Sequence, residues 1–189
     1  MARGRLRKRW PILATAAVLV AGTAGATTVF LVGSSQRRDD RAAYLRYERA
    51  VLVPIRAGGQ LVQQEMKPSL GDLGSGSLSA ALAVLRAGAW RSALTRTRNE
   101  ISAIRAPRFL GDIVRLWSVA MDGYLKIPDL FAQAARAAGA KRTALLDAAA
   151  EAGNRADKLF DDAARVMQYH RRRLGLGPTH DLPDPGARG

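Results

Sequence analysis

Hydrophobic residues after position 34 recur every three or four positions, which is the spacing of an amphipathic helix. This pattern predicts four long helices, over residues 34–66, 78–104, 107–138 and 141–174. A stretch rich in Gly and Ser predicts a loop over residues 67–77. Since no segment beyond the N-terminal region alternates hydrophobic and polar residues over the length of a strand, we expect an all-α fold. Short links favour an up-down four-helix bundle over residues 34–174, and two long hairpins paired between protomers are the alternative.

Each predicted helix has one hydrophobic face that would point into the bundle core. In the first helix this face contains Tyr44, Tyr47, Val51, Ile55, Val62 and Met66. The second helix is expected to bury Leu78, Leu82, Leu85, Ala89, Ile101 and Ile104. The third helix presents mainly large residues, among them Leu110, Ile113, Trp117, Met121, Tyr124 and Phe131. The fourth is rich in alanine, with Ala149, Ala152, Ala156, Ala163 and Met167 on its predicted face.

Ahead of the bundle, residues 11–33 contain no charged side chain. This run is long enough to cross a bilayer as a helix, which needs about 20 apolar residues. Residues 1–10 form a basic segment, and basic residues are fewer after the span. The positive-inside rule therefore predicts a single-pass protein of the cell membrane, with residues 1–10 in the cytoplasm, a transmembrane anchor over 11–33 and the bundle outside.

Two further features of the span leave alternatives open. Ala24-Gly25-Ala26 fits a signal-peptidase site, so cleavage after Ala26 would release a secreted bundle. Small residues also recur one turn apart, at Ala17, Ala21 and Gly25, a spacing that lets two spans associate as a homodimer. At the other end of the chain, residues 175–189 contain three prolines and no hydrophobic face, which predicts a disordered tail.

The amino-acid composition adds two observations, which are the net charge and the absence of cysteine. The chain of 189 residues carries a net charge of +14 and has no cysteine. The absence of cysteine excludes disulfide scaffolds, thiolate metal sites and thiol catalysis. A charge of this size first suggests a nucleic-acid partner, but the apolar span and the lack of aromatic residues among the basic ones argue against nucleic acid.

The sequence contains few residues of the kind that carry out catalysis. Neither of its two histidines, His170 and His180, belongs to a Glu-x-x-His pair, and His170 precedes three arginines whose charge should disfavour its protonation. No P-loop, H-E-x-x-H, G-x-S-x-G or haem motif occurs. We therefore expect no enzyme activity, no catalytic or metal site and no cofactor.

Basic residues outside the span are expected to gather at the end of the bundle that faces the lipid. An up-down bundle brings the start of its first and third helices and the end of its second and fourth helices to that one end. Contact with lipid headgroups is predicted for Arg37, Arg38, Arg41, Arg105, Arg108, Arg171, Arg172 and Arg173, with Arg96 and Arg98 nearby.

Residues that weaken or interrupt helices occur in all four predicted helices at similar heights. We expect these residues to form a belt around the bundle that would serve as a pocket or a hinge. With one nearby tyrosine, the belt contains Pro54, Gly58, Gly88, Tyr124, Pro128 and Gly153. The leading functional hypothesis is a non-enzymatic membrane protein whose bundle is an interaction or scaffolding module, with membrane lipids and an envelope protein as partners. The main alternative is a ligand-binding sensory bundle, which would signal through a partner protein.

Overall fold

The chain forms two compact units, Met1–Ala42 and Ala43–Gly189. The structure, a computed structural model, describes residues 10–177 and 179, and for residues 10–34 it describes the helical backbone alone. Among the residues searched in the described part of the chain, no helix is long and apolar enough to cross a membrane. The predicted anchor over residues 11–33 lies outside the part of the chain whose side chains are described.

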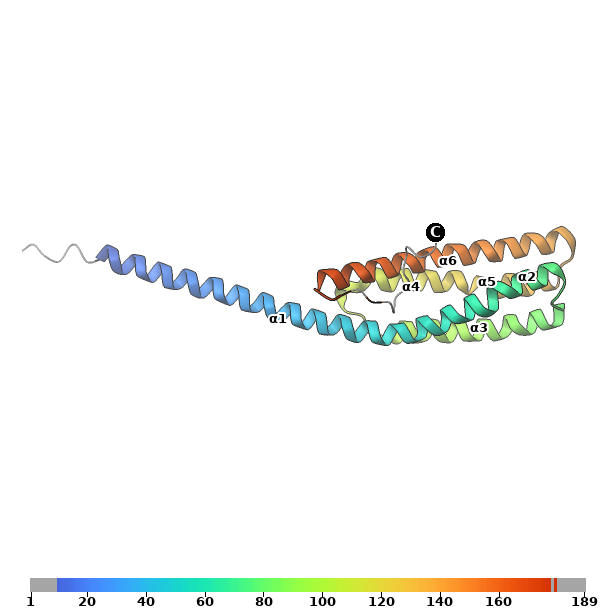
Figure 1. The fold of residues 1–189 in the computed structure, drawn as a ribbon, viewed down its shortest axis with the longest axis horizontal. Coiled ribbons are helices and arrows are strands. Elements are labelled where there is room, and N and C mark those ends of the chain that lie inside the picture. Colours follow the sequence, from blue (N-terminus) through green and yellow to red (C-terminus); the bar gives the residue numbers. More distant parts are fainter. Residues whose placement is uncertain (1–9, 178, 180–189) are drawn as a thin grey trace, which may run out of the picture. The chain divides into compact units, whose positions relative to one another are not determined.

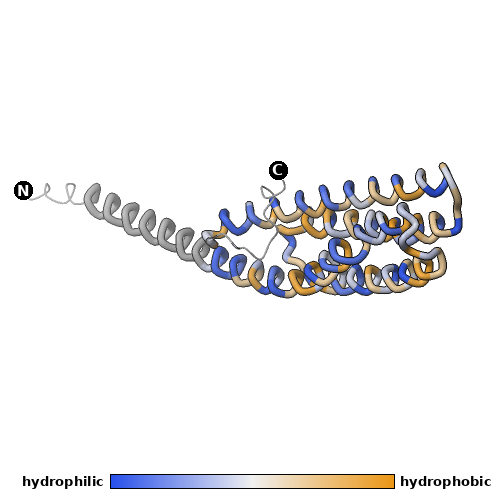
Figure 2. Tube along the Cα trace, turned by 45° about the vertical axis from the view of Figure 1, so that its right-hand side comes forward, coloured by the Kyte–Doolittle hydropathy of each residue, from blue (hydrophilic) through white to orange (hydrophobic). Residues whose placement is uncertain are grey.

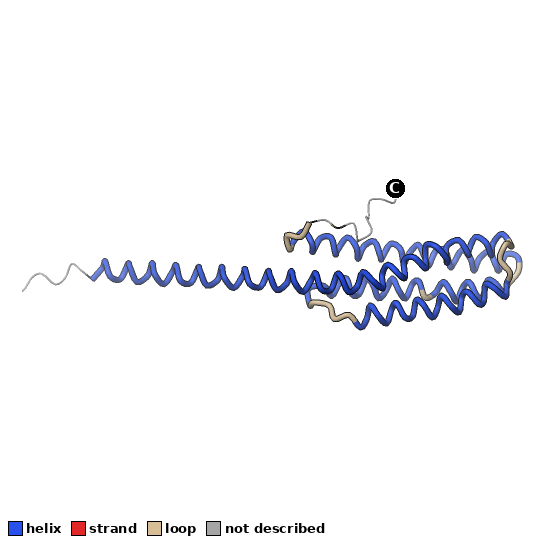
Figure 3. The backbone as a smooth tube through the Cα atoms, turned by 60° about the horizontal axis from the view of Figure 1, so that its bottom comes forward, coloured by secondary structure: helices blue, strands red, loops and turns tan. Residues whose placement is uncertain are grey.

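The second unit is a helical bundle with four arms in up-down order (Figures 1 and 3). The first arm is the end of α1 (Trp10–Gln60), the π-helix η1 (Leu61–Met66) and α2 (Lys67–Ser75). The second arm is α3 (Ala80–Ala103), and the third is the short η2 (Arg108–Leu110) with α4 (Gly111–Tyr124) and α5 (Lys126–Ala135). The fourth arm is α6 (Gly139–Arg173). Because the described residues contain helices and no strand, the predicted all-α bundle is confirmed.

The loop predicted over residues 67–77 is wrong for most of its length. The first arm remains helical through Ser75, because Pro68 lies in the first turn of α2, where its missing N–H is tolerated. Leu73 is buried and holds this helix against the core. The helix ends at Gly76, whose φ of 80° is the left-handed conformation that favours glycine. The next helix begins at Ala80, four residues after Gly76, and the hydroxyl of its N-cap Ser79 accepts a hydrogen bond from the Leu82 N–H.

The predicted buried face is correct for the first helix and only partly correct for the second, where Leu78 and Ile101 are buried as predicted and Leu82, Leu85 and Ala89 are exposed. All six residues predicted on the first face are buried, whereas Leu85 of α3 is 71% exposed and Leu82 is 40% exposed. The observed buried face of α3 follows alternating steps of four and three, through Ala83, Ala87, Trp90, Leu94, Thr97 and Ile101. Because this face contains alanines and a threonine, its spacing is hard to recognise in the sequence. The prediction followed the leucines at positions 82 and 85 instead, and both are exposed.

The two prolines that were expected to weaken or interrupt helices occupy different positions. Pro54 lies inside α1, which continues to Gln60 before the π-helix begins. Pro128 is not in a helix interior, because α4 ends at Tyr124 and α5 begins at Lys126. It therefore occupies the first turn of α5, where a helix makes no use of its N–H.

The helices that enclose the core differ in the size of the side chains that they bury. Hydrophobic residues of the bundle lie mainly on the inner sides of the arms (Figure 2). Large rings come from the second and third arms, where Trp90 packs on Phe131 with ring centroids 4.9 Å apart. The fourth arm contributes mostly small residues, and its buried members are Ala149, Ala152, Gly153, Ala156, Ala163, Ala164 and Met167. The aromatic rings thus fill the volume that the alanines leave.

The chain turns sharply where α6 ends, as the glycine at position 175 predicts. Gly175 has a φ of 68°, and the N–H of Leu176 bonds to the carbonyl of Arg171 at 2.9 Å. The Gly175 N–H bonds to Arg172, which completes a Schellman motif. Leu176 is buried, so the start of the segment predicted as a disordered tail packs on the bundle. Residues 178 and 180–189 of that segment, including His180, lie outside the described residues.

The observed face of α3 can be tested by two leucine truncations in the same helix. Leu94→Ala removes a fully buried side chain and should lower the free energy of unfolding by about 2–5 kcal/mol. Leu85→Ala removes an exposed side chain and should change it by less than about 0.5 kcal/mol. Urea unfolding followed by circular dichroism measures both values. Equal losses for the two variants would contradict the described face.

Candidate functional site

One end of the bundle combines aromatic rings with arginines. It is formed by the turn from α3 through η2 and by the last turns of α6, which meet where the rings of Phe109 and His170 lie 5.7 Å apart. The ring of Tyr169 lies 5.4 Å from His170. Phe109 is 36% exposed and Tyr169 is 53% exposed, although both are large hydrophobic residues. The same turn and helix end contain four exposed arginines, which are Arg105, Arg108, Arg172 and Arg173.

Burial, together with the positive charge at this end, favours the neutral form of His170. The pKa of His170 is lowered from its ordinary value, first by burial and then by the nearby positive charge of Arg173. The carboxylate of Asp112 acts in the opposite direction. The sequence predicted the direction of this effect from the neighbouring arginines, but burial is the larger cause. At neutral pH the ring is therefore an uncharged member of the aromatic group.

Arg171 differs from its two neighbours, because it points into the bundle. Its side chain is 12% exposed and forms an ion pair with the buried carboxylate of Glu48 on α1. Its Nε also donates to the carbonyl oxygen of Gly177 at 2.8 Å. The Nε and Nη1 groups of Arg171 are therefore used within the protein, and contact of this side chain with lipid headgroups stays a prediction. Successive helix residues point about 100° apart, so Arg172 and Arg173 remain outside.

Two buried tyrosines complete this connection between α1 and α6. The Tyr44 hydroxyl donates to the carbonyl oxygen of Met167 at 2.9 Å and lies 3.1 Å from Oε1 of Glu48. Burial, with the negative charge of Glu48, raises the pKa of Tyr44 well above its ordinary value. Burial alone raises the pKa of Tyr47 to about 12. Both hydroxyls therefore keep their protons far into the alkaline range.

The other arginines predicted to contact lipid come from other segments of the chain. Arg37, Arg38 and Arg41 are exposed residues of α1 in the first unit. Arg98 belongs to α3 and pairs with Asp122 of α4 at 2.8 Å, on the side of the bundle. The described surface at the bundle end thus combines four of the predicted arginines, Arg105, Arg108, Arg172 and Arg173, with two aromatic residues that the sequence analysis did not include.

The predicted belt of helix-weakening residues is not one site. A Cβ on Gly58 would lie 3.1 Å from the Thr97 side chain, so this glycine permits close packing of α1 on α3. Gly88 is exposed, with nothing within 4 Å of such a Cβ. Pro54 and Pro128 are buried. Of the predicted set, Gly153 lines a pocket, and Tyr124 joins the polar group beside it.

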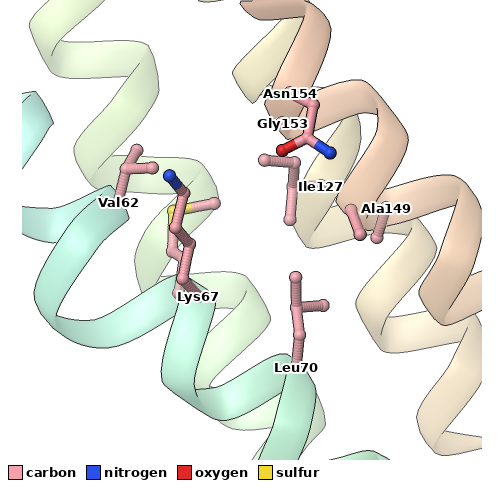
Figure 4. A pocket seen from close by; sticks show the side chains of 9 residues that line it. Val62, Lys67, Leu70, Ile127, Ala149, Gly153 and Asn154 are labelled. Carbon is pink, nitrogen blue, oxygen red and sulfur yellow. The ribbon is translucent and has the colours of Figure 1, made fainter. Parts of the chain in front are cut away.

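This pocket lies between the first arm and the helices α5 and α6, and its volume is about 280 Å³ (Figure 4). It is lined by Val62, Met66, Lys67, Leu70, Ile127, Ala149, Ala150, Gly153 and Asn154. The ammonium of Lys67 lies 2.7 Å from Oδ2 of Asp157. The other oxygen of that carboxylate accepts a hydrogen bond of 2.6 Å from Tyr124.

The described residues contain no group of three or more His, Asp or Glu side chains that could hold a metal ion. Comparison of the chain with protein-family models, with curated proteins and with solved structures finds no match.

Two sequence signals could have identified the residues that were missed. Phe109 directly follows Arg108, and Tyr169 directly precedes the stretch from His170 to Arg173, so aromatic and basic residues are adjacent at both positions. Most of the pocket lining gives no such signal, because valine, leucine and alanine at core spacing are typical of any bundle.

The two tyrosines predict a loss of stability in alkaline solution. The unfolded chain releases tyrosine protons near pH 10, whereas the folded protein retains them to higher pH. Their contribution is therefore complete below about pH 10 and declines above it, by about 1.4 kcal/mol per pH unit for each tyrosine. Urea unfolding at several pH values should show this slope, and Tyr47→Phe should remove about half of it. An unchanged slope in that variant would argue against the assignment.

Proposed function

We propose that the chain is a single-pass membrane protein without enzyme activity, whose bundle lies outside the cytoplasm and docks on its own membrane as an interaction module. The observation that carries the proposal is the bundle end at which Phe109 and Tyr169 are exposed beside four arginines. Tyrosine favours the membrane–water interface, where its ring is in apolar surroundings and its hydroxyl is hydrated, and phenylalanine is typical of the apolar face that an interfacial helix buries at the acyl boundary. Each arginine near an anionic surface contributes about 1 kcal/mol before salt screening.

The position of this end along the chain supports the same proposal. The predicted anchor ends at Gly33, and the first core residue is Tyr44. Tyr44 contacts Met167 near the end of α6, so the first arm enters the bundle at the end that contains the exposed rings. The turns near Gly76 and Ala138 lie at the opposite end of the bundle (Figure 1). The aromatic and basic end is thus the one that a short connection would hold near the bilayer.

Sequence asymmetry across the predicted span favours the stated orientation. Five basic residues precede the span, whereas three arginines, Arg37, Arg38 and Arg41, follow it closely. The bundle would then present its sides and its far end to a partner protein of the envelope. The charge of the whole chain supports lipid docking in this arrangement without requiring a nucleic acid.

The anchor can be tested on the full chain in cells. We expect the protein to remain in the membrane fraction after alkaline carbonate washing, because an uncleaved apolar helix is not extracted by high pH. Intact-mass analysis should show that residues 1–26 are retained, and deletion of residues 11–33 should release the protein. A mature chain beginning at Thr27 and free of the membrane would instead establish the secreted bundle.

Lipid docking can be measured with a fragment of residues 43–189, which contains every buried core residue. Changing Arg105, Arg108, Arg172 and Arg173 together to Gln should weaken its binding to anionic vesicles roughly 10- to 100-fold in co-sedimentation. The matched control removes the same charge elsewhere, from the exposed residues Lys126, Arg136, Lys141 and Lys158. Phe109→Ser with Tyr169→Ser should also weaken binding. If control and test variants bind equally, net charge alone explains the attraction, and the docking end is wrong.

A further inference from the structure

We propose that the pocket between the first arm and α5–α6 binds an uncharged, mainly apolar molecule of about two fused rings that carries one hydrogen-bond acceptor. The pocket is separate from the aromatic and basic end, and its lining shares no residue with that surface. The proposal goes beyond membrane docking and does not depend on it. It gives the bundle a ligand as well as a place on the membrane.

The pocket exists because its walls have short side chains on one side. α6 contributes Ala149, Ala150 and Gly153, so no large group from this helix fills the space. A Cβ at Gly153 would lie 3.4 Å from Cδ1 of Ile127, which is ordinary van der Waals contact. The packing therefore has room for a methyl group at this position, and the glycine leaves that room unfilled.

The opposite wall is formed where the first arm changes its helical hydrogen bonding. η1 is a π-helix, and the N–H of Lys67 bonds to the carbonyl of Val62, five residues earlier. π-Helical turns are rare in proteins, and those that do occur are frequently found at functional sites. Val62 and Met66 come from this turn, and Lys67 and Leu70 from the helix that follows.

The size and the polarity of the lining together define the ligand class. An apolar cavity of about 150 Å³ holds one benzene ring, and this pocket has about 280 Å³. Its polar groups are the Lys67 ammonium and the Asn154 amide, which lie toward the same side in Figure 4, with Leu70 on the opposite side. A ligand with one polar end and an apolar body matches this arrangement.

The charge of Lys67 is already compensated, so the ligand should be neutral. Its ammonium pairs with Asp157 at 2.7 Å, and their side chains are 38% and 15% exposed, respectively. The ammonium has three N–H donors, and this ion pair uses one of them. A carbonyl or ether oxygen can accept from another, whereas a carboxylate would bring a second negative charge close to Asp157.

The test uses the full chain in detergent micelles and the bicyclic ketone 2-acetylnaphthalene as the probe. Methyl NMR reports the δ1 methyl of Ile127 and the β methyl of Ala149, both of which line the pocket. We expect saturable shifts of these two signals, while the methyl signals of Ile55 and Ala87, buried outside the lining, remain nearly unchanged. Parallel, non-saturating shifts of all four signals would mean that the probe only partitions into micelles, and would overturn the proposal.

A matched pair of glycine substitutions tests the site itself. Gly153→Leu should fill the pocket and weaken binding at least about tenfold, whereas Gly88→Leu, at an exposed position with open space, should leave it unchanged. If Gly153→Leu does not fold, Gly153→Ala serves instead against Gly88→Ala, with a smaller weakening expected. Equal binding by both members of the pair would overturn the proposal.

Two analogues of the probe test the ligand class. 2-Ethylnaphthalene has the same shape without the acceptor and should bind about tenfold more weakly, as expected for loss of a hydrogen bond from a charged donor. 2-Naphthoate carries a negative charge and should bind no more tightly than the ketone. Tightest binding by the carboxylate would overturn the neutral class, and equal binding by ketone and hydrocarbon would overturn the role of Lys67.

Discussion

Close packing of α6 against the third arm governs the geometry of the bundle. A Cβ added to Gly123 of α4 would lie 3.0 Å from the Cβ of Ala156, so these two helices are already as near as their backbones permit. The small buried residues of α6 make this approach possible, but each of them removes little apolar surface from water. Three of the largest fully buried side chains, Trp90, Trp117 and Phe131, come from the other arms and fill the space that these small residues leave.

The same small residues also explain why the bundle has a pocket. Where α6 faces Gly123, the backbones meet and no space remains. One turn away, Gly153 faces Ile127 and the π-helical turn of the first arm, whose side chains do not reach across. A helix whose buried face is mostly alanine packs tightly where the neighbouring helix comes close, and it leaves a pocket where the side chains of the neighbouring helices do not reach it. We attribute the hollow to the changed hydrogen bonding of η1, because an unbroken α-helix would place different side chains on this wall.

How far the sequence predicts this structure depends on the size of the residues that mark each face. Tyr44, Tyr47 and Val51 are large and regularly spaced, and the face of α1 follows from them directly. The face of α3 includes alanines and Thr97, so its spacing is visible only once the burial of Trp90 is known. The helical course of α2 and the ion pair of Arg171 could not be predicted either. Both depend on contacts with residues distant in sequence, which local propensity does not contain.

The three consecutive arginines at the end of α6 show how one short segment can serve two purposes. Arg171 is held inside by Glu48 and by the carbonyl of Gly177, and it therefore ties the start of the bundle to its end. Arg172 and Arg173 point outward from the same turn and are exposed. A buried pair of this kind adds little net stability, but loss of either partner would leave an uncompensated charge in the interior. The ion pair therefore fixes the position at which α1 meets α6, and this position determines how the exposed arginines and aromatic rings are presented.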